Sequence, residues 1–211
     1  MADMAGTKKT EHTKAVSRRK FIQGVIAGGA GASSATYLFR ASGVVSGAGA
    51  RERLITLNVN GQQRRVDVMK QETLAMTLRY KLGLTGTKIG CDRAECGACT
   101  VLIDDVPRYS CSTLTHTVRN AKIVTVEGLA AADGTLHPVQ QGILEEQGFQ
   151  CAFCMSGFIM ATTGFLKTNP NPTRAELAHG ISGNLCRCQD YDKILTAMMR
   201  GAELMRGARH A

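Results

Sequence analysis

Alternating hydrophobic and polar positions mark the first folded part of the chain. Residues 54–59 alternate in this way and residues 64–68 do so again, with Asn60-Gly61 between them, which is typical of a two-residue hairpin turn. Further on, leucines recur at every fourth position, which indicates a helix. The predicted elements are strands at 54–59, 64–68, 100–103 and 123–126, a further short strand before Cys111, and a helix at 72–82. A small mixed sheet crossed by one helix is a ferredoxin-like β-grasp arrangement, and it predicts a first domain over residues 51–127.

After residue 128 the spacing of the apolar residues changes from two to about 3.6, which is the period of an α-helix. Thr173 and Glu176 have the spacing of a capping box at the start of one helical segment. The predicted helices cover residues 138–146, 156–167, 173–181 and 191–206. Four short helices predict a small bundle as the second domain, over residues 128–211. The expected fold class is therefore α+β.

The first fifty residues have the pattern of an export signal. Residues 17–19 (Ser-Arg-Arg) follow a polar, lysine-bearing segment and precede a weakly apolar stretch, residues 24–39, as in a twin-arginine signal. Residues 48–50 (Ala-Gly-Ala) supply a small-residue cleavage site. An amphipathic anchor or a single membrane span is the alternative, but residues 24–39 are rich in glycine, and a span needs about 20 strongly apolar residues. The sequence therefore predicts a signal peptide over residues 1–50 and export to the periplasm in folded form.

All eight cysteines fall into two groups of four with different spacing. One group has the spacing C-x4-C-x2-C with a fourth cysteine further on, and the other pairs C-x2-C with C-x-C. The β-grasp quartet is Cys91, Cys96, Cys99 and Cys111, and the helical quartet is Cys151, Cys154, Cys186 and Cys188. Four thiolates can hold two ferric ions and two sulfides, and the first spacing is that of plant-type [2Fe–2S] ferredoxins. We predict one [2Fe–2S] cluster on each quartet and a role in conducting electrons.

Disulfide bonds and structural zinc are the other interpretations of these cysteines. Eight cysteines can pair as four disulfides in a protein that matures outside the cytosol, and C-x2-C with C-x-C is not far from a zinc site. Gly97 and Ala98 lie between two cysteines of the β-grasp quartet. Such small residues favour a cluster over a crosslink, because they let backbone N–H groups approach the sulfur atoms.

The positive charge of the chain does not predict a nucleic-acid partner. The formal net charge is +9, but residues 1–50 hold seven Lys/Arg and two Asp/Glu, so +5 belongs to them and +4 to residues 51–211. A cluster of two ferric ions, two sulfides and four thiolates carries a charge of about −2, so two clusters bring the folded part to about zero.

Four motifs resemble those of a known family. They are residues 84–91 (LTGTKIGC), 95–100 (ECGACT), 150–154 (QCAFC) and 183–188 (GNLCRC). In order and spacing they resemble the two-cluster iron–sulfur subunit of the xanthine oxidase family of molybdenum hydroxylases, over about residues 51–205.

The resemblance implies a solvent-side cluster on the β-grasp quartet and a cluster nearest molybdenum on the helical quartet. In that family, the positions of Gln150 and Cys188 contact the pterin of the molybdenum cofactor. The cofactor, molybdopterin cytosine dinucleotide, is bound mainly by a separate large subunit. A flavin subunit or a c-type cytochrome is the implied electron acceptor, and no catalytic residue for the hydroxylation is expected in this chain.

Two segments depart from the family pattern. Residues 155–157 are Met-Ser-Gly where Thr-Pro-Gly is often found, which is more similar to isoquinoline and nicotinate dehydrogenases and to some bacterial aldehyde dehydrogenases. Residues 189–191 are Gln-Asp-Tyr where Thr-Gly-Tyr is common. Neither change removes a cysteine, so the departures bear on the substrate and not on the clusters.

The expected function is that of an electron-transfer subunit of an exported molybdenum hydroxylase, an oxidoreductase that oxidises an aldehyde or an N-heteroaromatic compound. The chain has no P-loop and no G-x-G-x-x-G after a strand, so we predict no nucleotide site of its own. The alternative is a stand-alone exported two-cluster ferredoxin. The two differ in a simple observation, because a carrier would purify alone and a subunit would co-purify with a much larger molybdopterin-bearing chain.

Overall fold

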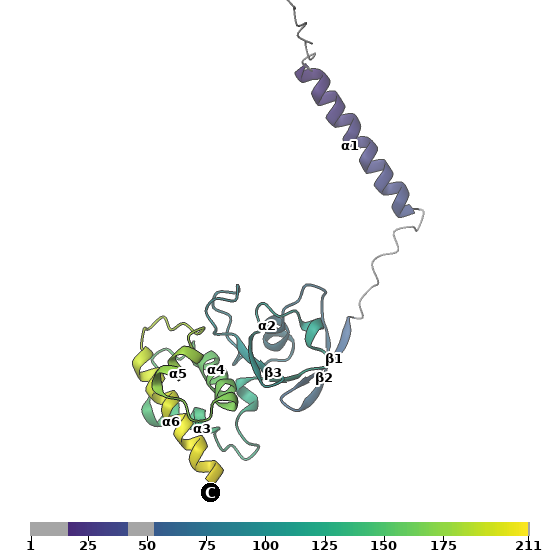
Figure 1. Ribbon diagram of the computed structural model, residues 1–211. Helices are drawn as coiled ribbons and strands as arrows, with labels where there is room; N and C mark the ends of the chain where they lie inside the picture. The colour runs from purple at the N-terminus through teal and green to yellow at the C-terminus, as the bar shows by residue number, and fades with distance from the viewer. Residues whose placement is uncertain (1–16, 42–52, 211) are drawn as a thin grey trace, which may run out of the picture. The chain divides into compact units, whose positions relative to one another are not determined.

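The computed structural model describes residues 17–41 and 53–210 (Figure 1). The chain divides into two compact units, residues 1–50 and residues 51–211. The described part of the first unit is one helix, α1 (Arg18–Ala41), and its side chains are exposed from residue 18 to residue 29. Among the described residues, no helix combines the length and the apolar character needed to cross a membrane. The predicted cleavage site at residues 48–50 lies outside the described residues.

Five strands of the second unit form one mixed sheet in the order β2-β1-β5-β3-β4. β1 and β2 pair antiparallel as the predicted hairpin, with Asn60 and Gly61 both at positive φ as a tight hairpin turn requires. β5 is parallel to β1 and antiparallel to β3, so it is the central strand and joins the β1–β2 pair to the β3–β4 pair. The strands are β1 (Leu54–Val59), β2 (Gln62–Asp67), β3 (Thr100–Ile103), β4 (Val106–Tyr109) and β5 (Lys122–Val124). The predicted α+β fold class is confirmed.

The helix that covers this sheet is shorter than the predicted 72–82. It begins as α2 (Leu74–Met76) and continues as a wider π-helical turn, η1 (Thr77–Lys81). The helix starts only after Thr73, because Thr73 is extended and forms an isolated β-bridge with Leu114. The carboxylate of Glu72 folds back and accepts hydrogen bonds from the N–H of Met69 and the hydroxyl of Thr77. Leu74 and Leu78 are buried as the periodicity indicated, and Leu82, just after the helix, is half-buried against the same core. The core beneath them consists of Ile55, Leu57, Val59, Val66, Val68, Leu74, Leu78, Val101, Val118 and Ile123.

Four α-helices follow the sheet. Two short 3-10 turns, η2 (Thr115–Val118) and η3 (Val126–Gly128), flank β5. The helices are α3 (Pro138–Glu146), α4 (Met155–Thr168), α5 (Arg174–Gly180) and α6 (Tyr191–His210). The predicted capping box of Thr173 and Glu176 is present at the start of α5. α3 and α6 approach closely because glycines face each other, and a Cβ on Gly142 would lie 2.5 Å from the backbone nitrogen of Gly201.

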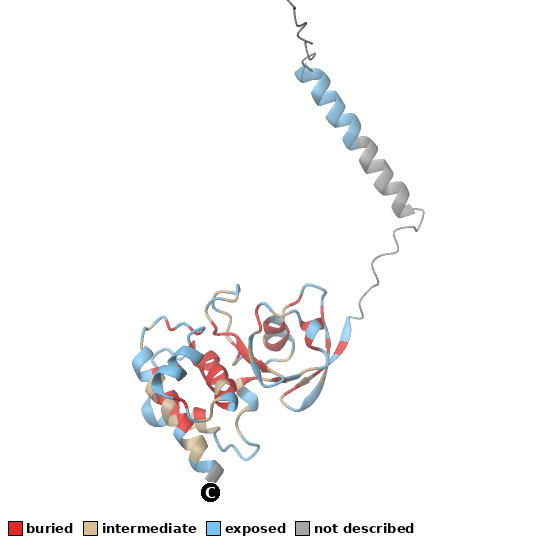
Figure 2. Cartoon of the chain, in the orientation of Figure 1, coloured by how far each residue is buried: buried red, intermediate tan, exposed pale blue. Residues whose placement is uncertain are grey.

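α4 is the most buried helix and joins the two parts of the second unit (Figure 2). One of its faces packs on the bundle core with Phe158 and Leu166, and another contacts β3 and β4. Gly164 permits that second contact, since a Cβ at this position would overlap the ring of Pro107. The helix thus brings the end of the sheet that carries the β-grasp quartet against the bundle that carries the helical quartet.

Candidate iron–sulfur sites

The β-grasp quartet lies in the loop between η1 and β3, with its fourth member just after β4. Cys99 and Cys111 are buried, and Cys91 and Cys96 are half-buried. The loop coils tightly, because Asp92 and Ala94 adopt positive φ, which non-glycine residues rarely do. In consequence the loop directs several of its backbone N–H groups toward sulfur atoms.

Backbone amides of this loop donate to two of the four sulfur atoms. The N–H groups of Glu95 and Cys96 each donate to the Sγ atom of Cys91 at 3.4 Å, and the N–H of Ala94 donates to the Sγ atom of Cys111 at 3.3 Å. Such a ring of N–H groups stabilises negative charge on thiolates and on the sulfides they surround. The geometry is that of an anion-binding loop, and a cluster with four thiolates is an anion.

The helical quartet is assembled from two segments that are distant in the sequence. Cys154 is the N-cap residue of α4, and Cys186 and Cys188 precede α6, as the sequence predicted. Cys154 and Cys186 are buried, Cys188 is half-buried and Cys151 is exposed. All four cysteines line one small cavity, together with residues of the segments next to them.

A hydroxyl group fixes the backbone of one member of this quartet. The N–H of Cys186 donates to the phenol oxygen of Tyr191 at 2.9 Å. Tyr191 is the first residue of α6, so the start of that helix holds the cysteine segment in place. Sequence reasoning did not assign this role to Tyr191, although its position three residues after the C-x-C motif was a usable signal.

The thiols differ in acidity for physical reasons. Burial by itself raises the pKa of Cys91, but the backbone N–H groups of Arg93, Glu95 and Cys96 outweigh it and lower the pKa to about 7. Burial raises the pKa of Cys99 to about 12, and burial together with the neighbouring Cys186 raises the pKa of Cys154 to about 12. Buried thiols of this kind ionise readily only beside a compensating cation, which ferric iron supplies.

The residues present fit the predicted [2Fe–2S] groups. All eight cysteines are free thiols, so the disulfide interpretation does not describe this structure. Within the described residues, no group of three or more His, Cys, Asp or Glu side chains is arranged to hold a single metal ion, as a structural zinc site would require. Thiolate donors in two sets of four, with amide donors aimed at the sulfurs of the β-grasp quartet, suit clusters that bring their own sulfide bridges. The assignment of individual cysteines as ligands stays a prediction.

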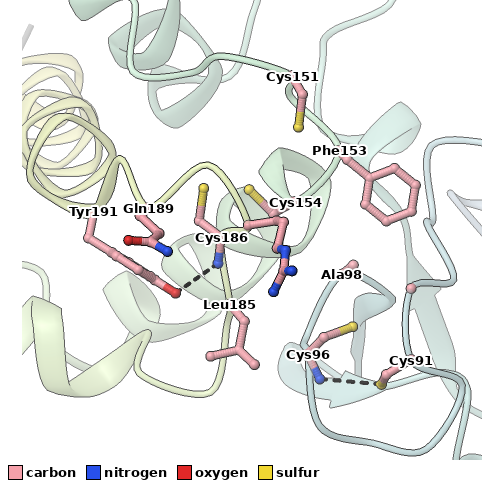
Figure 3. A pocket seen from close by; sticks show the side chains of 12 residues that line it. Cys91, Cys96, Ala98, Cys151, Phe153, Cys154, Leu185, Cys186, Gln189 and Tyr191 are labelled. Atoms are coloured by element: carbon pink, nitrogen blue, oxygen red, sulfur yellow. Dashed lines mark hydrogen bonds between the residues drawn. The ribbon is translucent and has the colours of Figure 1, made fainter.

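Both quartets open onto one groove with a volume of about 840 Å³ (Figure 3). Cys91 and Cys96 line it from the β-grasp side, and Cys151, Cys154 and Cys186 line it from the helical side. Its other walls are largely apolar and well exposed. They include Phe153, Leu185 and Tyr191, whose exposed fractions are 47 %, 52 % and 44 %.

The residues predicted to meet a pterin lie beside the helical quartet. Gln150 is exposed, and its Nε2 atom donates to the carboxylate of Asp190 at 3.3 Å. This contact uses one N–H of the Gln150 amide and leaves its second N–H and its oxygen available. Asp190 belongs to the segment 189–191, one of the two that the sequence analysis singled out as departing from the family pattern.

Fold and cysteine geometry together define a two-domain [2Fe–2S] protein, and comparison with known proteins agrees. Residues 57–122 match the family described as 2Fe-2S iron-sulfur cluster binding domain. Residues 125–199 match the family described as [2Fe-2S] binding domain.

Named proteins are similar to this chain over most of its length. The nicotine 6-hydroxylase small subunit of Paenarthrobacter nicotinovorans is 44 % identical over 145 residues, which are 69 % of this chain and 87 % of the relative. The nicotinate dehydrogenase small FeS subunit of Eubacterium barkeri is 40 % identical over 149 residues, 71 % of this chain and 94 % of the relative. The crystal structure of quinoline 2-oxidoreductase from Pseudomonas putida 86 contains a chain that is 40 % identical, with a TM-score of 0.69, over 74 % of this chain and 99 % of that one.

The protein belongs to the [2Fe–2S] iron–sulfur subunits of the xanthine oxidase family. It is the electron-transfer subunit of an oxidoreductase. The two cluster-binding domains confirm the prediction of two [2Fe–2S] clusters.

Proposed function

We propose that this chain carries electrons from a large molybdopterin-bearing subunit to an external acceptor. The observation that carries the proposal is the shared groove, onto which cysteines of both quartets open beside exposed apolar side chains. When bound, each cluster can accept and donate one electron. The chain supplies the thiols, the amide donors around them and the surface that meets the partner.

The apolar wall of the groove is the part of the surface that we assign to the large subunit. Exposed apolar side chains gathered around a polar site are typical of protein interfaces. Phe153 and Leu185 each lie next to a cysteine of the helical quartet, so a partner that covers them also covers Cys151, the one exposed cysteine. Gln150 and Cys188 would then face the pterin of a molybdopterin cytosine dinucleotide held by that partner.

The proposed substrate is an aldehyde or an N-heteroaromatic compound. The named relatives include the small subunits of a nicotine 6-hydroxylase and of a nicotinate dehydrogenase. Another is the aldehyde oxidoreductase iron–sulfur-binding subunit PaoA of Escherichia coli K12, which is 40 % identical over 159 residues, 68 % of this chain and 69 % of that subunit. A flavin subunit or a c-type cytochrome is the proposed acceptor, on the side of the β-grasp quartet.

Co-purification tests the proposed complex. The full chain, tagged at its C-terminus and expressed with the genes next to its own, should bring down a much larger chain that contains molybdenum and a cytosine nucleotide. Leu185→Asp should abolish this recovery, whereas Tyr80→Asp, an exposed aromatic residue outside the groove, should not. Recovery of the parent chain alone with two intact clusters would favour the stand-alone ferredoxin instead.

We also propose that the first fifty residues direct export through the twin-arginine route to the periplasm. Arg18 and Arg19 begin the exposed helix α1, and this segment is a compact unit separate from residues 51–211, as suits a removable leader. Changing both arginines to lysine should leave a folded, cluster-loaded protein in the cytoplasm. Unchanged delivery of that variant to the periplasm, or a mature protein that begins at Met1, would refute this proposal.

A further inference from the structure

The two cysteine quartets are joined by a direct contact between their loops. The N–H of Leu185 donates to the backbone oxygen of Cys96 at 2.9 Å. The neighbouring side chain of Asn184 donates through Nδ2 to the backbone oxygen of Gly97, also at 2.9 Å. The segment just before Cys186 is therefore bonded to the segment that carries Cys96, so a residue next to one quartet touches a member of the other.

A third hydrogen bond reaches the same loop from the sheet. The hydroxyl of Tyr109, the last residue of β4, donates to the backbone oxygen of Gly183 at 2.8 Å. Tyr109 also packs against the small buried cluster of Ala75, Cys99 and Cys111. Tyr109 thus connects two members of the β-grasp quartet to the loop that leads into Cys186, across 74 positions of sequence.

Glycines bring the backbones of the two loops close together. A Cβ on Gly97 would lie 2.6 Å from the backbone oxygen of Gly183, and a Cβ on Gly157 of α4 would overlap the backbone oxygen of Gly97. Asn184 is only 4 % exposed, so its amide is held in a closed environment. Apart from the Asn184 amide itself, which would lie 2.5 Å from a Cβ on Gly97, the loops meet through backbone atoms at this point.

We propose that Tyr109 and Asn184 are positioning residues of a clamp that holds the two cluster loops at a fixed separation for electron transfer between them. The clamp is the set of three hydrogen bonds from Tyr109, Asn184 and Leu185. The clusters, when bound, would supply a one-electron donor and a one-electron acceptor, and the clamp would hold the loops that carry them. The rate of such a transfer falls steeply with distance, so a fixed separation of the loops sustains it.

A merely packing role for Tyr109 would need only its ring. The phenol is half-exposed at the edge of a polar groove of about 470 Å³, which Gly183 and Asn184 also line. Its hydroxyl donates to Gly183 across this groove. Phenylalanine would keep the packing against the cluster that contains Cys99 and Cys111 but would not make the hydrogen bond.

Tyr109→Phe in the full cluster-loaded chain tests the clamp. Hydrogen exchange of the backbone amides at residues 183–186, followed by mass spectrometry, should become roughly 2- to 10-fold faster, because one hydrogen bond no longer opposes local opening. Tyr80→Phe, a control in an exposed tyrosine, should leave this exchange unchanged. Asn184→Ala should accelerate it further, since a buried donor is lost. Iron and sulfide content should stay at the parent level in Tyr109→Phe.

A second readout measures the separation of the clusters. In electron paramagnetic resonance of the fully reduced chain, magnetic interaction between the clusters splits the signals. In Tyr109→Phe and Asn184→Ala this splitting should decrease, or the split lines should broaden. Unchanged exchange and unchanged splitting in Tyr109→Phe would overturn the clamp, and so would loss of a cluster from that variant.

The inference rests on the proposed passage of electrons through both clusters, but its test does not depend on the partner. Faster exchange in a chain that binds no large subunit would support the clamp and refute the proposed complex. Parent-like exchange in a variant of a chain that does form the complex would refute the clamp alone.

Discussion

Replacing Glu72 with alanine should destabilise the β-grasp domain and loosen the segment that carries Cys111. The carboxylate of Glu72 is buried and accepts hydrogen bonds from the hydroxyl of Thr77 at 2.7 Å and from the N–H of Met69 at 3.2 Å. It also pairs with the ammonium of Lys81 at 2.5 Å. The hydroxyl of Thr77, which this carboxylate holds, lies 2.8 Å from the hydroxyl of Thr115, four residues after Cys111.

The size of the effect follows from these contacts. Hydrogen bonds to a charged group contribute about 1.5–3 kcal/mol each, but the ion pair contributes less than about 1 kcal/mol because Lys81 is one-third exposed and also donates to the backbone oxygen of Asp67. Because these contributions are not additive, we expect a loss of about 2–4 kcal/mol in the free energy of unfolding. For a domain pair of this size that corresponds to a decrease in Tm of roughly 4–16 °C.

Thermal unfolding of the cluster-loaded chain, followed by circular dichroism and by visible absorbance of the clusters, measures this loss. Glu72→Gln should lose less, since it keeps an acceptor for Thr77. Asp67→Asn, which breaks only the exposed pair with Arg53, should change Tm little. A Tm within about 1 °C of the parent in Glu72→Ala would refute the reasoning.

The stabilisation by Glu72 should also depend on pH. Burial alone raises the pKa of Glu72, but hydrogen bonds from Lys81, Thr77 and Met69 outweigh it and hold the pKa below its ordinary value. A lowered pKa in the folded state gives stability that is fully present above the unfolded pKa of about 4.3 and is lost as the pH falls below it toward the folded pKa. The difference in stability between parent and Glu72→Ala should therefore be constant at neutral pH and decrease at acidic pH. A difference that grew on acidification would contradict this sign.

Three further changes test the cluster sites. Cys154→Ser should remove the helical cluster, because a cluster cannot lose one thiolate in four without exposing iron; two unchanged [2Fe–2S] signals would contradict this assignment. Gly157→Val should destabilise the contact between α4 and the loop at residues 96–99, since the valine side chain would overlap the backbone oxygen of Gly97. A Tm like that of the parent would contradict this prediction. Gln150→Ala should keep both clusters yet weaken cofactor retention or turnover in the complex, at a cost of about 1–3 kcal/mol, whereas Asp190→Asn should have a smaller effect; parent-like turnover of Gln150→Ala would refute the predicted pterin contact.

Local sequence determined the elements of this protein and the kind of group that its cysteines suit. Alternation at residues 54–59 and the Asn60-Gly61 turn predicted the opening hairpin, and the structure has it with both turn residues at positive φ. Thr173 and Glu176 predicted the cap of α5 in the same way. These features depend on bonds between residues a few positions apart, so their spacing in the chain is enough to reveal them.

Tertiary structure decided what each part touches. The sequence predicted a single helix over residues 72–82, but a β-bridge between Thr73 and Leu114 delays its start and a π-helical turn completes it. The spacing of Cys151 and Cys186 says nothing about their distance, and only the packing of α4 and α6 places both at one cavity.

The contact between the quartets is the clearest example of what spacing does not show. Tyr109 and Gly183 lie 74 positions apart, and Leu185 reaches Cys96 only because glycines at 97 and 157 let two loops meet backbone to backbone. Cysteine spacing determined which metal groups the chain suits, because ligand number and local turn geometry are written in short motifs. The separation and mutual support of those groups were decided by burial and hydrogen bonding between distant segments, which exist only once the sheet and the bundle have packed together.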